Sequence, residues 1–176
     1  MSRSNPFAKK PRRPNLTVLA VGEGETEEAF LKFLKALYNK RDNGISIKVK
    51  YAGGGGPECV IDHTIRMNPE NYDRTFVLID KDKPCSQKHI DKATKLNIKI
   101  IWADPCVEGF FLKIRGMRIN TNVHNSAHYK KIFEDKYLNS NDKLIPEKYD
   151  QIFSLALLEK SRKLVDELDQ IICLMT

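Results

Sequence analysis

Acidic side chains follow two apolar runs of the chain at the point where each run ends. Residues 16–21 read LTVLAV and lead through a glycine into Glu23, while residues 76–79 read FVLI and lead into Asp80 and Asp82. Because the carboxyl ends of neighbouring parallel strands share one edge of a sheet, where open α/β folds bind ligands, we expect these three carboxylates to meet. Three carboxylates at one edge predict a divalent-metal site.

The spacing of these acids favours a shared site. Glycines on both sides of Glu23 allow a tight turn, and Glu27 comes one helical turn later on a face that can look back at the same point. Asp80 and Asp82, two apart in an extended chain, project to the same side of the backbone. Ligands that are all carboxylate oxygens select a hard cation, so the expected cofactor is Mg²⁺ or Mn²⁺.

A non-metal explanation exists for each acid taken alone. An aspartate after a strand is a common helix cap or turn residue. Glu108, a few residues beyond another apolar run, is either a further ligand or a capping acid at the start of a short helix over residues 106–114. A bound cation would compensate the repulsion among the acids, and Lys81 and Lys83 offer a competing compensation.

Phosphate-binding groups are expected beside the acids. Lys81 and Lys83 alternate with the aspartates, so in an extended segment they point the other way, where they either hold a flanking phosphate or only balance charge. The glycine run 53–56 follows another apolar segment; Gly54 and Gly55 fit a backbone anion nest, or the run is a flexible connection. The chain lacks GxxxxGK[ST], and no GxGxxG follows its first apolar run, which disfavours nucleotide hydrolysis and dinucleotide binding.

The elements that must position these residues alternate between strand and helix patterns. Apolar or alternating runs predict strands over residues 16–22, 45–51, 75–79 and 98–103. Helical spacing predicts helices over about residues 26–40, 57–67 and 86–96 between them. This order predicts an α/β fold whose four-stranded, mainly parallel sheet is flanked by helices.

The C-terminal third reads as helical. Apolar residues recur at helical spacing over residues 126–137 and again over about 149–174. We expect a helical extension, residues 116–176, packed on the same domain as residues 16–115. The Phe110-Phe111 run and the C-terminal apolar stripe serve either this core or a homo-oligomer interface.

Much of the formal charge of +7 is carried by the first fifteen residues. They form an expected disordered basic arm that contacts nucleic-acid phosphates or acts as a solubilising leader. Its basic residues include Lys9, Lys10, Arg12 and Arg13. No secretory signal pattern and no run long enough to span a bilayer is visible, so the expected location is the cytoplasm.

The cysteines show no CxxC spacing, which predicts reduced, mostly buried thiols. Cys59 and His63 are four residues apart, as are Cys85 and His89. Two such pairs could form a Cys₂His₂ zinc site if their helices touched, but chance spacing is the better explanation.

The acidic motifs resemble the paired Glu and DxD motifs of the Toprim fold, which occurs in topoisomerases, bacterial primases and OLD-family nucleases. The string Gly22 to Glu27, preceded by a basic arm and followed by residues 104–108 (DPCVE), resembles the RloB-like subgroup, whose pattern is similar to EGxxTE and NPCFE. The chain departs from that pattern with Asp104 for Asn, Val107 for Phe, and Gly109 for a bulky residue.

This resemblance implies a Mg²⁺-dependent nuclease linked to restriction and phage-defence loci. It implies a core metal site of Glu23, Asp80 and Asp82, with Glu27 and Glu108 as additions. No side chain stands out as general base, so Glu23 or a hydroxide on the metal must serve. The rivals are a non-catalytic nucleic-acid-binding or scaffolding module that acts with a companion protein, and a primase-like nucleotidyl transferase.

Overall fold

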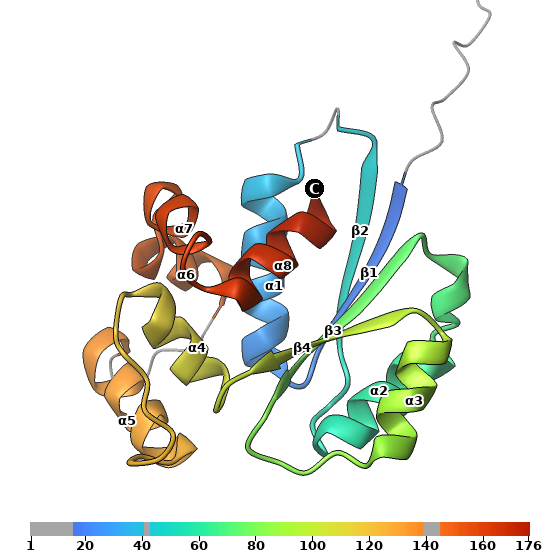
Figure 1. The fold of residues 1–176 in the computed structure, drawn as a ribbon. Helices are drawn as coiled ribbons and strands as arrows, with labels where there is room; N and C mark the ends of the chain where they lie inside the picture. Colours follow the sequence, from blue (N-terminus) through green and yellow to red (C-terminus); the bar gives the residue numbers. More distant parts are fainter. Residues whose placement is uncertain (1–15, 41–42, 139–144) are drawn as a thin grey trace, which may run out of the picture.

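Four strands form a parallel sheet at the centre of the molecule, in the order β2-β1-β3-β4 (Figure 1). The computed structural model describes residues 16–40, 43–138 and 145–176. The strands are β1 (Leu16–Gly22), β2 (Ile45–Tyr51), β3 (Arg74–Asp80) and β4 (Ile98–Ala103). The predicted α/β class and all four strands are confirmed, and the alternating segment β2 lies at a sheet edge, as its pattern indicates.

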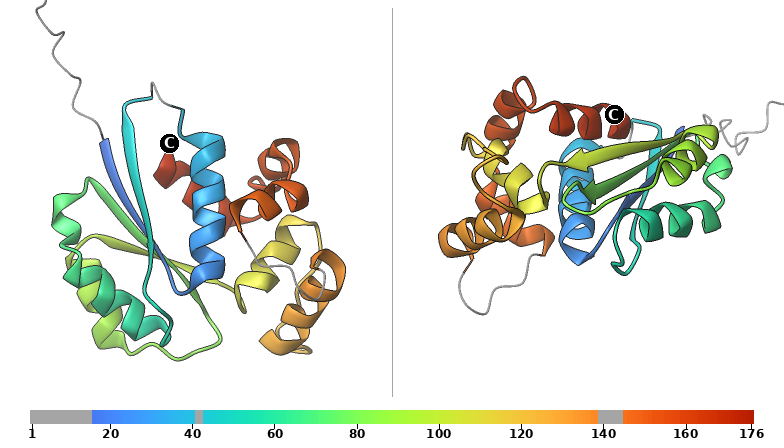
Figure 2. Two further views of the ribbon diagram at one scale, coloured as in Figure 1. Left: turned by 180° about the vertical axis from the view of Figure 1, so that it is seen from behind. Right: turned by 60° about the horizontal axis from the view of Figure 1, so that its bottom comes forward.

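Helices cover both faces of the sheet, which explains why β1 has no polar alternation in its buried part. Val18 and Ala20 pack with α1 (Glu25–Tyr38) and the C-terminal helices. Leu19 and Val21 pack with α2 (Pro57–Arg66) and α3 (Gln87–Lys95) on the opposite face. Figure 2 shows the two layers from behind and from below. A short 3₁₀ turn, η1 (Pro69–Asn71), leads from α2 towards β3.

The C-terminal part of the chain forms a helical layer. Its helices are α4 (Val107–Ile114), α5 (Ser126–Tyr137), α6 (Pro146–Ile152), α7 (Leu155–Ser161) and α8 (Asp166–Met175). The helical stretch expected from about residue 149 to 174 is three helices, because local capping interrupts it. Ser154 accepts the backbone N–H of Leu157 and so starts α7 as a new helix.

An aromatic cluster joins this layer to the sheet. Phe30 of α1 contacts Phe110 and Phe111 of α4, and also Tyr149 and Phe153 near α6. All five side chains are fully buried. The core alternative for the Phe110-Phe111 run is therefore confirmed.

The cysteines are all free thiols, but the expectation that most of them are buried is wrong. Cys106 is buried, Cys85 is partly exposed, and Cys59 and Cys173 are exposed. The basic arm, with Lys9, Lys10, Arg12 and Arg13, lies outside the described residues. Within the described ranges no helix is both long and apolar enough to cross a lipid bilayer.

Candidate functional site

Four acids from four different segments meet at the C-terminal edge of the sheet. Glu23 directly follows β1, Asp80 is the last residue of the neighbouring strand β3, and Glu108 lies in the first turn of α4, after β4. Glu27 lies in the first turn of α1. We call these four residues the acidic edge.

Gly22 allows the close approach that brings Glu27 to this edge. A Cβ atom added at Gly22 would lie 2.6 Å from the Cβ of Glu27 and 3.0 Å from the backbone nitrogen of Glu28. Only a residue without a side chain fits at this point, because real Cβ atoms do not come so close to their neighbours. The end of β1 therefore packs directly against the first turn of α1.

Three members of the acidic edge are buried and have one partner each. Glu23, Glu27 and Asp80 are 7%, 5% and 7% exposed. Glu27 Oε2 accepts the N–H of Gly24 at 2.9 Å, and Asp80 Oδ1 accepts the N–H of Val107 at 2.8 Å. The capping explanation considered for isolated acids thus holds for one oxygen of Glu27 and one of Asp80.

Glu23 has an ionic partner instead. Its Oε1 atom lies 2.8 Å from the Lys83 ammonium. This is the competing charge compensation anticipated from the sequence, and it raises the pKa of Lys83. Lys83 therefore occupies a position where a bound cation would compete with it.

Two carboxylate oxygens of the acidic edge have no hydrogen-bond partner among the described residues. They are Glu23 Oε2 and Glu108 Oε2, and both atoms are buried. An unpaired carboxylate oxygen away from water costs free energy. An added cation or proton donor at these two atoms would relieve that cost.

The electrostatics show that the four acids are close neighbours. Burial, followed by repulsion from Glu27 and Glu108, raises the pKa of Asp80 from 3.8 to about 7. Burial also raises the pKa of Glu27, with further contributions from Glu108 and Glu23. The charges therefore destabilise one another as the chain stands, which a cation would relieve.

Asp82 does not continue the extended strand that the sequence argument assumed. The strand ends at Asp80, residues 81–83 bend, and Asp82 is exposed while Asp80 is buried. Backbone bonds from Lys81 and Asp82 to the Pro105 carbonyl hold this bend. The assumption of alternation across 80–83 is therefore wrong, and the metal and catalytic roles of Asp82 remain predictions.

The expected phosphate-binding groups are partly engaged within the chain. Lys81 pairs with Asp104 at 2.8 Å rather than projecting freely. The backbone N–H of Gly54 donates to the Glu23 carbonyl at 2.9 Å, so the glycine loop buttresses the acidic edge. All four glycines from Gly53 to Gly56 have positive φ, and that of Gly55 is 95°. Anion binding by Gly54 and Gly55 stays a prediction.

One cation near the acidic edge was missed in the sequence. Burial lowers the pKa of Lys130 of α5, but the negative charges of Glu108 and Asp80 outweigh burial, so the pKa is raised overall. No local motif marks this residue, because it lies 22 residues after Glu108 in the chain and only tertiary packing brings it back.

The donor types of the acidic edge suit a hard cation, although the side chains are not arranged as a finished cage. Among the residues that the structure describes, no three His, Cys, Asp or Glu side chains form a group ready to hold an ion. If Lys83 moved away, the Oε1 atom of Glu23 would also be free. The edge then offers carboxylate oxygens alone, the set that Mg²⁺ and Mn²⁺ prefer.

The Cys/His pairs form no zinc site in the described chain. His89 contacts Ser86 Oγ at 2.8 Å and lies 3.3 Å from Glu58 and 3.4 Å from Asp62. Chance spacing is the explanation that the structure supports.

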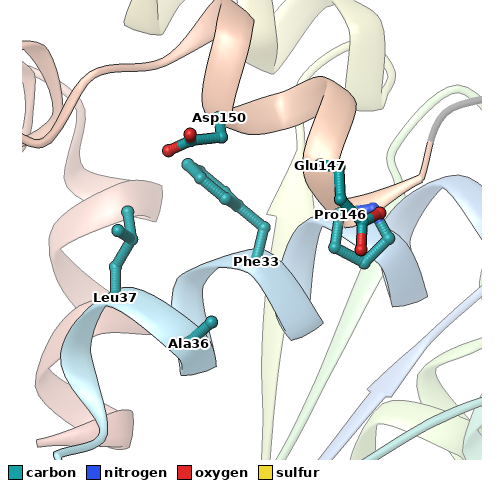
Figure 3. Close-up of a pocket in the computed structure, with 6 residues that line it drawn as sticks. All are labelled: Phe33, Ala36, Leu37, Pro146, Glu147 and Asp150. Atoms are coloured by element: carbon teal, nitrogen blue, oxygen red, sulfur yellow. The ribbon is translucent and has the colours of Figure 1, made fainter.

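A separate pocket of about 300 Å³ lies between α1 and α6 (Figure 3). Apolar side chains of Phe33, Leu37 and Pro146 form its walls, and Glu147 and Asp150 stand at α6. Its lining contains no predicted site residue.

Comparison with known protein families gives a match over most of the chain. Residues 18–173 match the family described as RloB-like protein. No curated protein and no solved structure matches the chain. Because the match covers nearly the whole chain and includes every member of the acidic edge, the chain belongs to the RloB-like protein family.

Proposed function

We propose that this chain is a nuclease that uses Mg²⁺ or Mn²⁺ to cleave phosphodiester bonds of DNA or RNA. The observation that carries the proposal is the pair of buried, partnerless oxygens on Glu23 and Glu108, set among two further acids at the ligand-binding edge of a parallel sheet. A structural cluster of this kind would be expected to satisfy its own oxygens.

The residues of the acidic edge have distinct tasks in this proposal. Glu23, Asp80 and Glu108 hold the cation, and Glu27 orients the turn through its bond to Gly24. Asp82, at the exposed rim, is a further candidate ligand. A bound divalent cation supplies Lewis acidity towards the phosphoryl oxygen and lowers the pKa of a water molecule.

Lys83 and Glu23 must separate for this chemistry. The Lys83 ammonium then becomes available to a phosphate oxygen, as do the exposed groups of the glycine loop. Glu23 also remains a candidate for accepting a proton from the attacking water, because its Oε2 atom has no hydrogen-bond partner among the described residues.

The biological setting follows from the Toprim and RloB-like resemblance rather than from geometry. We propose a cytoplasmic enzyme of phage defence, associated with restriction loci and acting on nucleic acid. A companion defence protein and self-association are included as expected partners.

One observation favours the rival function, a non-catalytic nucleic-acid-binding module. Glu27 and Asp80 each cap a backbone N–H, and Lys83 already neutralises Glu23, so the acids have structural duties without a metal. Such a module would bind phosphates without turnover and would be indifferent to chelation.

A cleavage assay separates these functions. Labelled single-stranded DNA, duplex DNA and RNA are incubated with the full chain in Mg²⁺, in Mn²⁺ or in chelator. We expect cleavage of at least one substrate that chelator abolishes and that Asp80→Ala reduces to the chelator level. Asp91→Ala, an exposed acid on α3, is the matched control and should retain cleavage. Full cleavage by Asp80→Ala would contradict the proposal.

A further inference from the structure

The first turns of α5 lie against the start of α4, beside the acidic edge. The Cys106 thiol, at the cap of α4, lies 3.8 Å from the Ser126 carbonyl at the start of α5. The ring of Phe111 contacts that of Phe133 at 5.3 Å between centroids, which fixes the two helices against each other. Figure 1 shows α4 and α5 side by side beyond the end of β4.

Lys130 lies on the face of α5 that is turned towards this contact. It follows Ser126 by four residues, and residues at this spacing are neighbours on one side of a helix. Cys106 in turn contacts the Glu108 side chain. The helix face that carries Lys130 is thereby placed next to Glu108.

The loop before α5 is also fixed. The Tyr129 hydroxyl accepts the N–H of Asn120 at 2.8 Å and donates to the Asn120 carbonyl at 3.0 Å. Tyr129 itself is 2% exposed. Lys130 is thus attached to an anchored helix and not to a loose surface loop.

Lys130 differs from Lys81 and Lys83 in having no ion-pair partner among the residues that the structure describes. Lys83 pairs with Glu23 and Lys81 with Asp104, each at 2.8 Å. Within the described ranges the Lys130 ammonium makes neither a hydrogen bond nor an ion pair, although its side chain is half-buried. The hydroxyl of Ser126, one turn earlier, is likewise buried without a partner.

The acids act on Lys130 electrostatically but form no ion pair with it within the described ranges. Glu108, Asp80 and Asp82 all favour its charged form. An ammonium that served only as a counter-ion would be expected to close onto one of these carboxylates, as Lys83 does on Glu23. A charged, unengaged donor at the border of an anionic site suits an anionic ligand that arrives with its own cations.

We propose that Lys130 binds a phosphate oxygen of the nucleic acid at the acidic edge. This inference rests on the proposed function, since it assigns the ligand of the same site. It makes the C-terminal helical layer part of the substrate-binding surface: the sheet edge supplies the acids, and α5 supplies a cation that holds the backbone next to them.

The test is the salt dependence of binding to a fluorescein-labelled, 20-nucleotide single-stranded DNA and its RNA counterpart. Anisotropy is measured in Ca²⁺, with gel analysis to verify that the probe stays intact. One lost phosphate contact lowers the slope of log K against log salt concentration by about 0.7 for a single strand. We expect Lys130→Ala to show this loss, with an affinity roughly tenfold lower at low salt.

Two variants make the result specific. Lys131→Ala removes the same charge from the next, exposed position of α5, about 100° around the helix, and should leave the slope unchanged. Lys130→Arg keeps the charge and should retain most of the affinity. Lys130→Ala behaving like Lys131→Ala, or a wild-type chain that binds neither probe, would overturn the inference; thermal melts verify that each variant folds.

A parallel Mn²⁺ titration distinguishes failure of this inference from failure of the proposed function. Lys130→Ala should still bind Mn²⁺ if the wild type does. If Lys130→Ala has the same salt slope as the wild type and Mn²⁺ still binds, only the phosphate role of Lys130 is wrong. If Mn²⁺ does not bind but the salt slopes still differ, the proposed metal site is wrong and Lys130 remains a phosphate contact.

Discussion

Two groups of acids in this molecule contrast in how their charges are compensated. Three of the four residues of the acidic edge are buried, and two of its carboxylate oxygens have no hydrogen-bond partner within the described ranges. The second group, which we call the α2–α3 cluster, consists of Glu58 and Asp62 on α2 with Ser86, His89 and Lys92 at α3. There Glu58 accepts the N–H of Ser86 at 2.9 Å, and Asp62 lies 3.3 Å from the Lys92 ammonium.

The pKa values of Glu58 and Asp62 move in the opposite direction from that of Asp80. Hydrogen bonds from Ser86 lower the pKa of Glu58. For Asp62 burial raises the pKa, but the bonds from Lys92 and His89 outweigh it, so the pKa is lowered overall. At the acidic edge burial dominates and neighbouring acids add to it, so the pKa of Asp80 rises to about 7.

The difference separates acids whose charges the chain itself compensates from acids whose charges it compensates only in part. The α2–α3 acids are paired by the chain itself and partly solvated, as expected for a surface network. At the acidic edge two carboxylate oxygens have no hydrogen-bond donor among the described residues. Raised carboxylate pKa values such as that of Asp80 are typical of functional sites.

The largest effect should come from removing single charges at the acidic edge. Glu23→Gln and Glu108→Gln keep the shape of each side chain but weaken cation binding, so we expect cleavage to fall by roughly 100-fold or more. Glu58→Gln, the same change in the α2–α3 cluster, should leave cleavage within about twofold. Initial rates in Mg²⁺ measure both, and equal losses at the two locations would erase the contrast.

The next effect concerns the pH dependence of stability in chelator. Because the folded chain raises the pKa of Asp80 from 3.8 to about 7, the folded state holds a proton in that interval that the unfolded state releases. The free energy of unfolding should therefore decrease as the pH rises from about 4 to about 7, by on the order of 3 kcal/mol.

Asp80→Asn should flatten this slope and make the chelated chain more stable than wild type at pH 7.5. The amide oxygen can still accept the Val107 N–H, so the cap is kept while the charge is removed. The lowered pKa values of Glu58 and Asp62 act the other way, since their contribution is lost as the pH falls through the lowered values. Urea titrations over this pH range measure the slope; an unchanged slope in Asp80→Asn would show that another group dominates.

A smaller effect should follow from moving Glu27 without altering its charge. The extra methyl of Gly22→Ala would overlap the Glu27 Cβ, so we expect a cost of about 1–3 kcal/mol in unfolding free energy and weaker cation binding. Gly24→Ala is the control, because its added Cβ would lie 3.4 Å from Glu27 Oε2, an ordinary contact. Denaturant unfolding compares the two; equal stability would mean that the turn adapts.

The smallest effect is expected in the α2–α3 cluster. Lys92→Ala removes the ammonium from Asp62 in a partly exposed pair, so the free energy of unfolding should change by less than about 1 kcal/mol. Thermal melts in high and low salt measure it. A loss well above this value would mean that the cluster contributes more to the fold than its exposure indicates.

Much of the fold was accessible from the sequence because buried parallel strands carry an unmistakable pattern. The continuous apolar runs of β1 and β3 placed Glu23 and Asp80 at strand ends, and parallel pairing then brought them together. The breaks within residues 149–174 were not accessible, because apolar spacing continues through them and single caps such as Ser154 end one helix and start another.

The site was predicted less completely for reasons of tertiary structure. The position of Asp82 depends on a bend that backbone bonds to Pro105 hold, and strand alternation says nothing about such bonds. Sequence spacing identified the acids and also named Lys83 as a competing source of positive charge. That Lys83 pairs with Glu23 in particular, and that Lys130 approaches the edge from α5, depends on tertiary packing that no local pattern encodes.

The most direct measurement of the central claim is a Mn²⁺ titration followed by calorimetry and electron paramagnetic resonance. We expect saturable binding by the wild-type chain, loss of binding in Asp80→Asn, and retention of binding in Asp62→Asn. Absence of binding by the wild type, or equal binding by Asp80→Asn, would contradict the claim that the acidic edge is a divalent-metal site.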